Sequence, residues 1–140
     1  MDQFGTCLIL DLHSFPSTPL PFEFSQTFPR PDICVGTDDF HTSKALIEFT
    51  KNFFENQGLS VKLDDPFSGS IVPRRYYRKT PEVQSIMIEI NRALYMDETS
   101  GKKAAGFDLT RAIIGRYIRS ACEFFLHPAQ EHSPTPFHQW

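Results

Sequence analysis

The sequence predicts an α/β protein in which helices flank a mixed sheet. Short apolar runs that are typical of strands alternate along the chain with segments of helical periodicity, the order that βαβ connections produce. The chain has 140 residues, of which 40% are hydrophobic and 22% charged, enough for one globular domain. We expect this domain to span residues 1–126 and to be followed by a flexible, proline- and histidine-containing tail, residues 127–140.

The first half of the chain contains two predicted strands and one helix. Residues 6–12 form an apolar run that ends at polar residues, as a buried strand does. A second short strand is expected over residues 33–35, between proline and glycine residues that favour turns. Apolar residues then recur at helical spacing over residues 44–56, and Thr42 or Ser43 can cap this helix.

The second half begins with residues 59–63, which alternate between apolar and polar like a half-buried strand. Residues 64–81 are rich in Pro, Gly and Arg and predict a long loop, a feature that tends to be functional. Residues 83–90 are the next strand, and residues 108–126 are an amphipathic helix. Its predicted apolar stripe consists of Leu109, Ala112, Ile113, Tyr117, Ser120, Ala121 and Phe124.

Charge and composition argue against several classes of protein. The net charge of −3 gives no basic field, which disfavours nucleic-acid binding, and no apolar run approaches the roughly 20 residues of a membrane span. The first residues carry no positive charge, so we expect no secretory signal. Cys7, Cys34 and Cys122 form no disulfide framework, which favours a cytoplasmic protein with cysteines in the core rather than as nucleophiles.

Two residues at predicted strand ends are candidates for chemistry, because functional groups of α/β proteins gather there. His13 follows the first strand, where it can present a ring nitrogen as ligand or catalyst, or be satisfied by local hydrogen bonds. Glu89 lies among isoleucines and a methionine. Burial there would raise the pKa of its carboxyl group toward that of a general base, whereas a sheet face open to water would leave it an ordinary surface carboxylate.

The long loop contains a cationic and aromatic cluster. Its members are Arg74, Arg75, Tyr76, Tyr77 and Arg78. Guanidinium groups bind carboxylates and phosphates in bidentate fashion, so the cluster is either an anion site or a solvated charge run. Asn91 and Arg92 follow the next strand and can belong to the same pocket, although Arg92 can equally pair with Asp97 or Glu98.

Other polar residues have simpler explanations. The aspartate pairs at residues 38–39 and 64–65 suit turns better than a metal. His41 belongs to a loop or to the start of a helix, and the spacing of His127, His132 and His138 matches no metal motif. No P-loop, dinucleotide fingerprint or HExxH motif is present in the sequence.

A series of segments nevertheless resembles a known family. In chain order they are Asp11–Pro16 (DLHSFP), Pro31–Thr37 (PDICVGT), Asp65–Ser70 (DPFSGS), Gln84–Arg92 (QSIMIEINR) and Leu94–Glu98 (LYMDE). The series, over residues 5–125, resembles the N-formylglutamate amidohydrolase family, whose fold is similar to that of zinc carboxypeptidases. The resemblance implies that His13 binds zinc, that Glu89 is the general base, and that Arg75, Asn91 and Arg92 bind an acidic N-formyl or N-acyl amino acid.

The resemblance also sets an expectation about completeness. The family has a further His and an acidic zinc ligand before the residue that corresponds to His13, but only twelve residues precede His13 here and none is His or Glu. We therefore expect an N-terminally truncated version of the fold, with exposed strand edges that favour self-association. The implied reaction hydrolyses N-formyl-L-glutamate to glutamate and formate in histidine degradation. The alternatives are an inactive relative and a metal-independent carboxylate-binding module.

Overall fold

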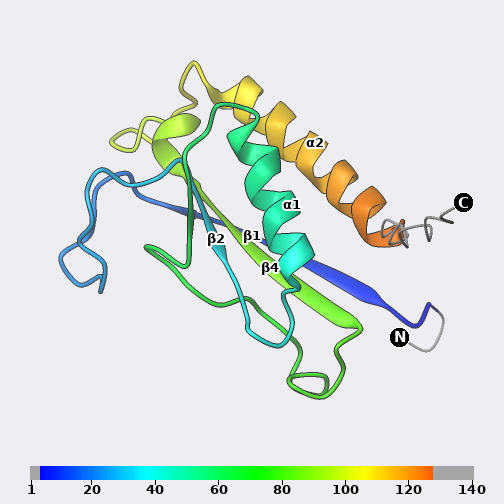
Figure 1. The fold of residues 1–140 in the computed structure, drawn as a ribbon. Coiled ribbons are helices and arrows are strands. Elements are labelled where there is room, and N and C mark those ends of the chain that lie inside the picture. Colours follow the sequence, from blue (N-terminus) through cyan, green and yellow to red (C-terminus); the bar gives the residue numbers. More distant parts are fainter. Residues whose placement is uncertain (1–3, 128–140) are drawn as a thin grey trace, which may run out of the picture.

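The computed structural model describes residues 4–127, which form a four-stranded sheet with two helices on one of its faces (Figure 1). The strands have the spatial order β1-β4-β2-β3; β2 runs antiparallel to β4, and the other neighbours are parallel. This is the mixed α/β sheet that the sequence predicts. The elements are β1 (Cys7–Phe15), β2 (Ile33–Gly36), α1 (Lys44–Glu55), β3 (Val61–Leu63), β4 (Val83–Asn91), a 3-10 turn (Arg92–Leu94) and α2 (Phe107–Leu126).

All six predicted elements exist, but the end of the first strand was predicted wrongly. β1 continues beyond residue 12 to Phe15, because the polar residues there still pair with β4. In an edge strand whose faces differ, polar side chains at alternate positions do not end the pairing. His13 therefore lies inside β1, opposite Glu89, and not in a loop after it.

The core lies between the helices and one face of the sheet. α1 begins at Ser43, whose hydroxyl accepts a hydrogen bond from the Leu46 N–H at 3.3 Å. Leu46 and Phe54 from this helix pack against buried isoleucines and valines of β2 and β4. Tyr117 of α2 is fully buried among phenylalanines and shares a 3.0 Å hydrogen bond with the Thr50 hydroxyl. Burial raises the pKa of Tyr117 to about 12.

Two sequence-based assignments to the core are wrong. On α2, Ile113, Tyr117 and Ala121 are buried, but Leu109 is 64% exposed and Ala112 is also exposed. At 3.6 residues per turn, Ala112 lies about 140° around the helix from Tyr117, so the predicted stripe was too wide. Among the cysteines, Cys34 is buried and Cys7 half-buried, whereas Cys122 is exposed. Neither α1 nor α2, the α-helices of the described residues 4–127, has the length and hydropathy that a membrane span requires.

Candidate active site

A cleft of about 420 Å³ opens on the face of the sheet that the helices leave uncovered. It is lined by Asp11, His13, Phe67, Ser68, Gly69, Ser70, Ile71, Met87 and Glu89. Side chains alternate between the two faces of a strand, so the isoleucines of β4 enter the core while Met87 and Glu89 face the cleft. β1 and β4 pair in parallel with His13 opposite Glu89, and this register brings together two residues that are far apart in sequence.

His13 is held by a carboxylate of its own strand. Its Nε2 atom lies 2.8 Å from Asp11 Oδ1, and the side chain of His13 is 53% exposed. Asp11 precedes His13 by two residues, so both side chains leave β1 on the cleft face. A carboxylate in this position fixes the orientation of the imidazole ring. Asp11 belongs to the DLHSFP motif but is not among the residues predicted for the site; its spacing of two residues from His13 is the sequence signal that points to it.

Glu89 is a buried carboxyl group with an unused oxygen. The residue is 8% exposed, and its Oε2 atom has no hydrogen-bond partner within the described part of the chain. Burial raises the pKa of Glu89 above its ordinary value, although the nearby charges of His13 and Arg92 act in the opposite direction. Of the two environments considered for Glu89, the structure shows the buried one, and a carboxyl group of this kind is suited to accept a proton.

The segment Phe67–Ile71 forms one wall of the cleft and is held close to the sheet. The Ser85 hydroxyl of β4 donates to the carbonyl oxygen of Ile71 at 2.8 Å. Gly36 of β2 lies directly beneath the wall, where a Cβ atom would collide with the Gly69 carbonyl and with the Met87 side chain. Glycine is therefore required for this close approach. The Ser70 hydroxyl is buried and, among the residues the structure describes, has no hydrogen-bond partner.

Comparison with known proteins identifies the family. The family model for N-formylglutamate amidohydrolase matches residues 1–96, more than half of the chain. The chain belongs to the N-formylglutamate amidohydrolase family. The resemblance that the sequence motifs indicated is thereby confirmed.

A solved structure shows the same fold at greater length. The crystal structure of N-formylglutamate amidohydrolase from Ralstonia eutropha JMP134 superposes with a TM-score of 0.73 at 25% sequence identity. The match covers 91% of this chain and 48% of that chain, so this chain spans about half the length of the solved relative. No curated protein matches the chain.

The two residues after β4 occupy different environments from each other. Asn91 is buried, its amide donates to the Pro31 carbonyl at 3.0 Å, and its oxygen accepts from the Ala93 N–H at 3.1 Å. Both polar groups of Asn91 thus hold the backbone turn. The guanidinium of Arg92 donates to the hydroxyl and the carbonyl oxygen of Ser14, each at 3.2 Å. Arg92 is therefore attached to the end of β1 and is not among the residues that line the cleft.

The arginine and tyrosine cluster does not line the cleft. Arg75 is exposed, and its guanidinium stacks on the Tyr76 ring at 4.4 Å from the centroid. Arg78 forms an ion pair with Asp39. Of the five residues predicted for the site, the structure therefore places His13 and Glu89 in the cleft lining and Arg75 outside it, while Arg92 is near enough for its charge to act on Glu89.

His41 and Cys34 are structural. His41 is fully buried, its Nδ1 donates to the Val83 carbonyl at 2.7 Å, and its Nε2 accepts from the Arg78 N–H at 2.8 Å. Both ring nitrogens are used to attach the loop to β4. The Cys34 thiol donates to the Phe67 carbonyl at 3.1 Å, and burial raises its pKa to about 11. A thiol with this pKa is not a nucleophile at neutral pH.

The donor set can be compared with the needs of a catalytic zinc ion. Such an ion normally takes three protein ligands and a water molecule. Over residues 4–127 no group of three His, Cys, Asp or Glu side chains is arranged to hold a metal ion. His13 and Asp11 form a pair, and Glu89 lies beside them with a free oxygen. The described residues alone do not fit a resident zinc ion.

Proposed function

We propose that the chain provides the base-bearing part of an amidohydrolase site for an acidic N-formyl amino acid, with N-formyl-L-glutamate as the first substrate to test. One observation carries the proposal: the buried carboxylate of Glu89, with an unpartnered oxygen, faces an open cleft beside His13. Family membership and the name of the solved relative support the choice of substrate. This reaction would remove formate at the end of histidine degradation.

In the proposed mechanism Glu89 acts on water. Its carboxylate accepts a proton from a water molecule, whose oxygen attacks the formyl carbon. When the carbon–nitrogen bond breaks, Glu89 returns that proton to the departing amino group, which gives glutamate and formate. The raised pKa of Glu89 strengthens it as a base, and the basic form is present only above that pKa.

Two neighbouring groups complete the proposal. Asp11 orients His13 beside the reacting centre, and Arg92 neutralises a substrate carboxylate at the end of β1. Arg75 and Asn91 were predicted with Arg92, but Arg75 lies outside the cleft and Asn91 has no free polar group. We assign Asn91 to holding the turn and leave Arg75 without a role in the site.

Zinc enters the proposal only as an ion held jointly by His13 and by ligands from outside the described residues. No step above depends on it, because those residues do not complete a zinc site. The free cysteines are compatible with a cytoplasmic location, which we also propose.

The test is formate release from N-formyl-L-glutamate by the 140-residue chain and two variants. Glu89→Gln is expected to lower turnover by about 10²- to 10⁴-fold, the usual contribution of a general base. Glu55→Gln changes an exposed glutamate of α1 and is expected to keep full activity. Equal turnover in wild type and Glu89→Gln would contradict the assigned role.

The incomplete metal site favours a second candidate function. If the chain binds but does not hydrolyse acidic N-formyl amino acids, it is a carboxylate-binding relative without catalysis. Calorimetric titration with N-formyl-L-glutamate would then show binding that a chelator does not change, together with no release of formate. Chelator-sensitive turnover would exclude this second function.

A further inference from the structure

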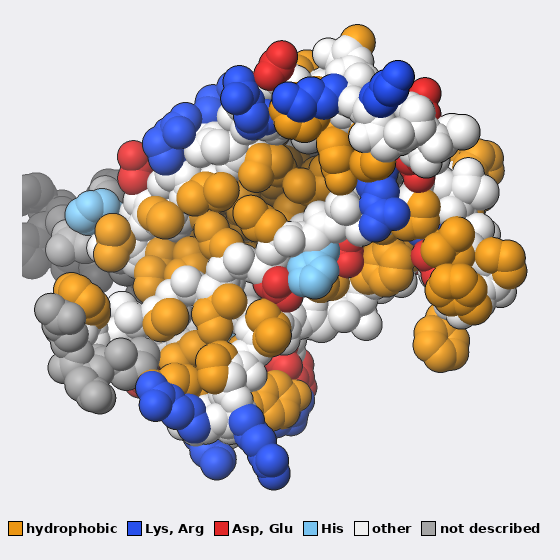
Figure 2. All heavy atoms as spheres, turned by 180° about the vertical axis from the view of Figure 1, so that it is seen from behind, with side chains coloured by type: hydrophobic (Ala, Val, Ile, Leu, Met, Phe, Trp, Pro, Cys, Tyr) orange, Lys and Arg blue, Asp and Glu red, His pale blue; other side chains and the backbone are white. Residues whose placement is uncertain are grey.

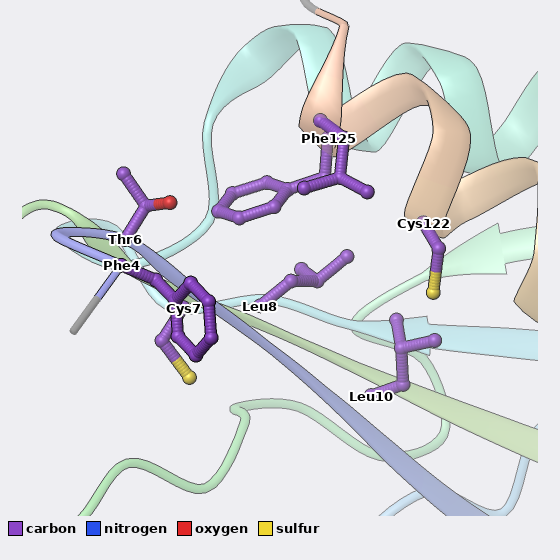
Figure 3. A pocket seen from close by; sticks show the side chains of 8 residues that line it. Phe4, Thr6, Cys7, Leu8, Leu10, Cys122 and Phe125 are labelled. Carbon is purple, nitrogen blue, oxygen red and sulfur yellow. The ribbon is translucent and has the colours of Figure 1, made fainter. Parts of the chain in front are cut away.

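α2 carries a second apolar strip beside its buried stripe. The strip consists of Phe107, Ile114, Ile118, Cys122 and Phe125; its C-terminal end lies by β1, and its N-terminal part lies by Ile90 at the end of β4. Between it and the sheet lie two hollows, one of about 400 Å³ next to Ile114 and Ile118 and one of about 380 Å³ next to Leu8 and Leu10 (Figure 3). Seen from behind, hydrophobic side chains gather in a hollowed band (Figure 2). A helix that is apolar on two sides is typically packed on both.

The edge of the sheet next to this strip is unprotected. β1 is an edge strand of nine residues, and the Cys7 N–H donates to Glu82 of the neighbouring chain segment. The N–H and C=O groups of successive residues point to opposite sides of a strand. Since those of Cys7 point toward β4, those of Leu8, Leu10 and Leu12 point away from the sheet. β1 contains no lysine or proline that would block pairing. The opposite edge, β3, has only three residues, one of which is Lys62.

We propose that a second copy of this chain docks against β1 and the strip of α2, with the two β1 strands antiparallel. A two-fold interface requires a surface that matches itself when reversed. Four of the five strip residues, Phe107, Ile114, Ile118 and Phe125, are spaced by seven, four and seven residues, so reversal leaves their order unchanged; Cys122 would face Thr110. Leu8, Leu10 and Leu12 are likewise unchanged by reversal.

The dimensions of the two elements also agree. Nine residues of strand and twenty residues of helix each extend about 30 Å, so the strand edge and the strip have matching lengths. The match covers 48% of the solved relative, so two copies together contain about as much chain as one molecule of that relative. A dimer would bury the hydrophobic band of Figure 2, which a single copy exposes to solvent.

Pairing of this kind has a consequence for the cleft. In the proposed pairing, the backbone groups of Leu8, Leu10 and Leu12 in one copy bond to those of the same residues in the other. Residues that lie opposite each other then place their side chains on the same face of the joined sheet. Asp11 and His13 of both copies then leave the joined sheet on the same face. When Leu10 of one copy lies opposite Leu10 of the other, the two His13 side chains are six residues, or about 20 Å, apart along the joined strands, so the two candidate sites share a face but do not meet.

The test is the molar mass in solution, measured by light scattering after size exclusion at several protein concentrations. We expect wild type to have twice the mass of the chain. Leu12 and Leu63 are each 42% exposed on opposite edge strands, and this makes them a matched pair. Leu12→Lys is expected to give monomers, because a lysine on the pairing edge blocks association. Leu63→Lys is expected to remain dimeric.

Circular dichroism and thermal unfolding show whether each variant is folded. If Leu12→Lys does not fold, Ile118→Glu places a charge in the strip instead and is expected to give monomers as well. A monomeric wild type at the highest concentration would overturn the proposal, as would dimers in both folded edge variants or a wild type that forms open, larger assemblies. Mass is measured without substrate, so the result is independent of the proposed hydrolysis.

Discussion

The two faces of the sheet are built from the same strands but have different roles: one packs against the helices, and the other carries the cleft. On the helix side of β4, Ile86 and Ile88 are fully buried. On the cleft side, Met87 and Glu89 lie beneath a loop instead of a helix. Because neighbouring residues of a strand point to opposite faces, four consecutive positions supply both the core and the candidate site.

The polar groups show the difference most clearly. On the helix side the buried hydroxyls of Thr50 and Tyr117 satisfy each other. On the cleft side Ser70 Oγ and Glu89 Oε2 are buried without a partner among the described residues. Unpaired buried polar atoms cost stability unless a ligand or water satisfies them. One face thus stabilises the fold, and the other retains polar groups that a substrate can use.

The largest effect is expected from a core residue that never touches the cleft. Ile88→Ala removes a fully buried side chain and is expected to lower the free energy of unfolding by about 2–5 kcal/mol. Chemical denaturation measures this loss. The affinity of the folded variant for N-formyl-L-glutamate is expected to be unchanged. If binding fell in the folded variant, the separation between the two faces would be refuted.

A smaller effect that joins the faces is expected at Gly36. Gly36→Ala forces the wall at Gly69 away from the sheet and is expected to cost about 1–3 kcal/mol of stability, the usual cost of overpacking. It should also weaken binding in the cleft. Gly115→Ala in α2 is the control, since its Cβ would meet only Arg119 at 3.9 Å, and it is expected to raise stability slightly. Unaltered stability and binding in Gly36→Ala would show that the wall is not tightly packed.

Sequence patterns predicted the elements because alternation and helical spacing are local. Glu89 could be identified because one charge in an apolar strand must be compensated or functional. The pairing of His13 with Glu89 and the end of β1 could not be predicted, since strand register depends on partners more than seventy residues away. The placement of Arg75 outside the cleft likewise depends on the path of a loop that has no periodic signal.

The same lack of local signal explains the error on α2. A helix wheel shows which residues are apolar but not which direction the sheet occupies. Leu109 therefore counted toward the core although it is exposed, whereas Ile114 and Ile118 were left out although they line a hollow beside Ile90 of β4. Only the packing of the strands decides between the two sides of the helix.

The most direct test of the account concerns the carboxylate of Glu89. Burial raises its pKa above the ordinary 4.5, so the folded state prefers the protonated form. Its contribution to stability is full below pH 4.5 and is lost as the pH rises through the raised value. The Glu89→Gln variant has no carboxyl group at this position, so its stability does not fall as the pH rises through that value.

The measurement is the difference in melting temperature between Glu89→Gln and wild type across that pH range. We predict a difference that grows in favour of the variant as the pH rises and then levels off. Exposed Glu55→Gln is expected to show no such trend. A constant difference, or a wild type that gains stability over the variant with rising pH, would mean that Glu89 carries no buried, destabilised charge and would contradict its role as the base.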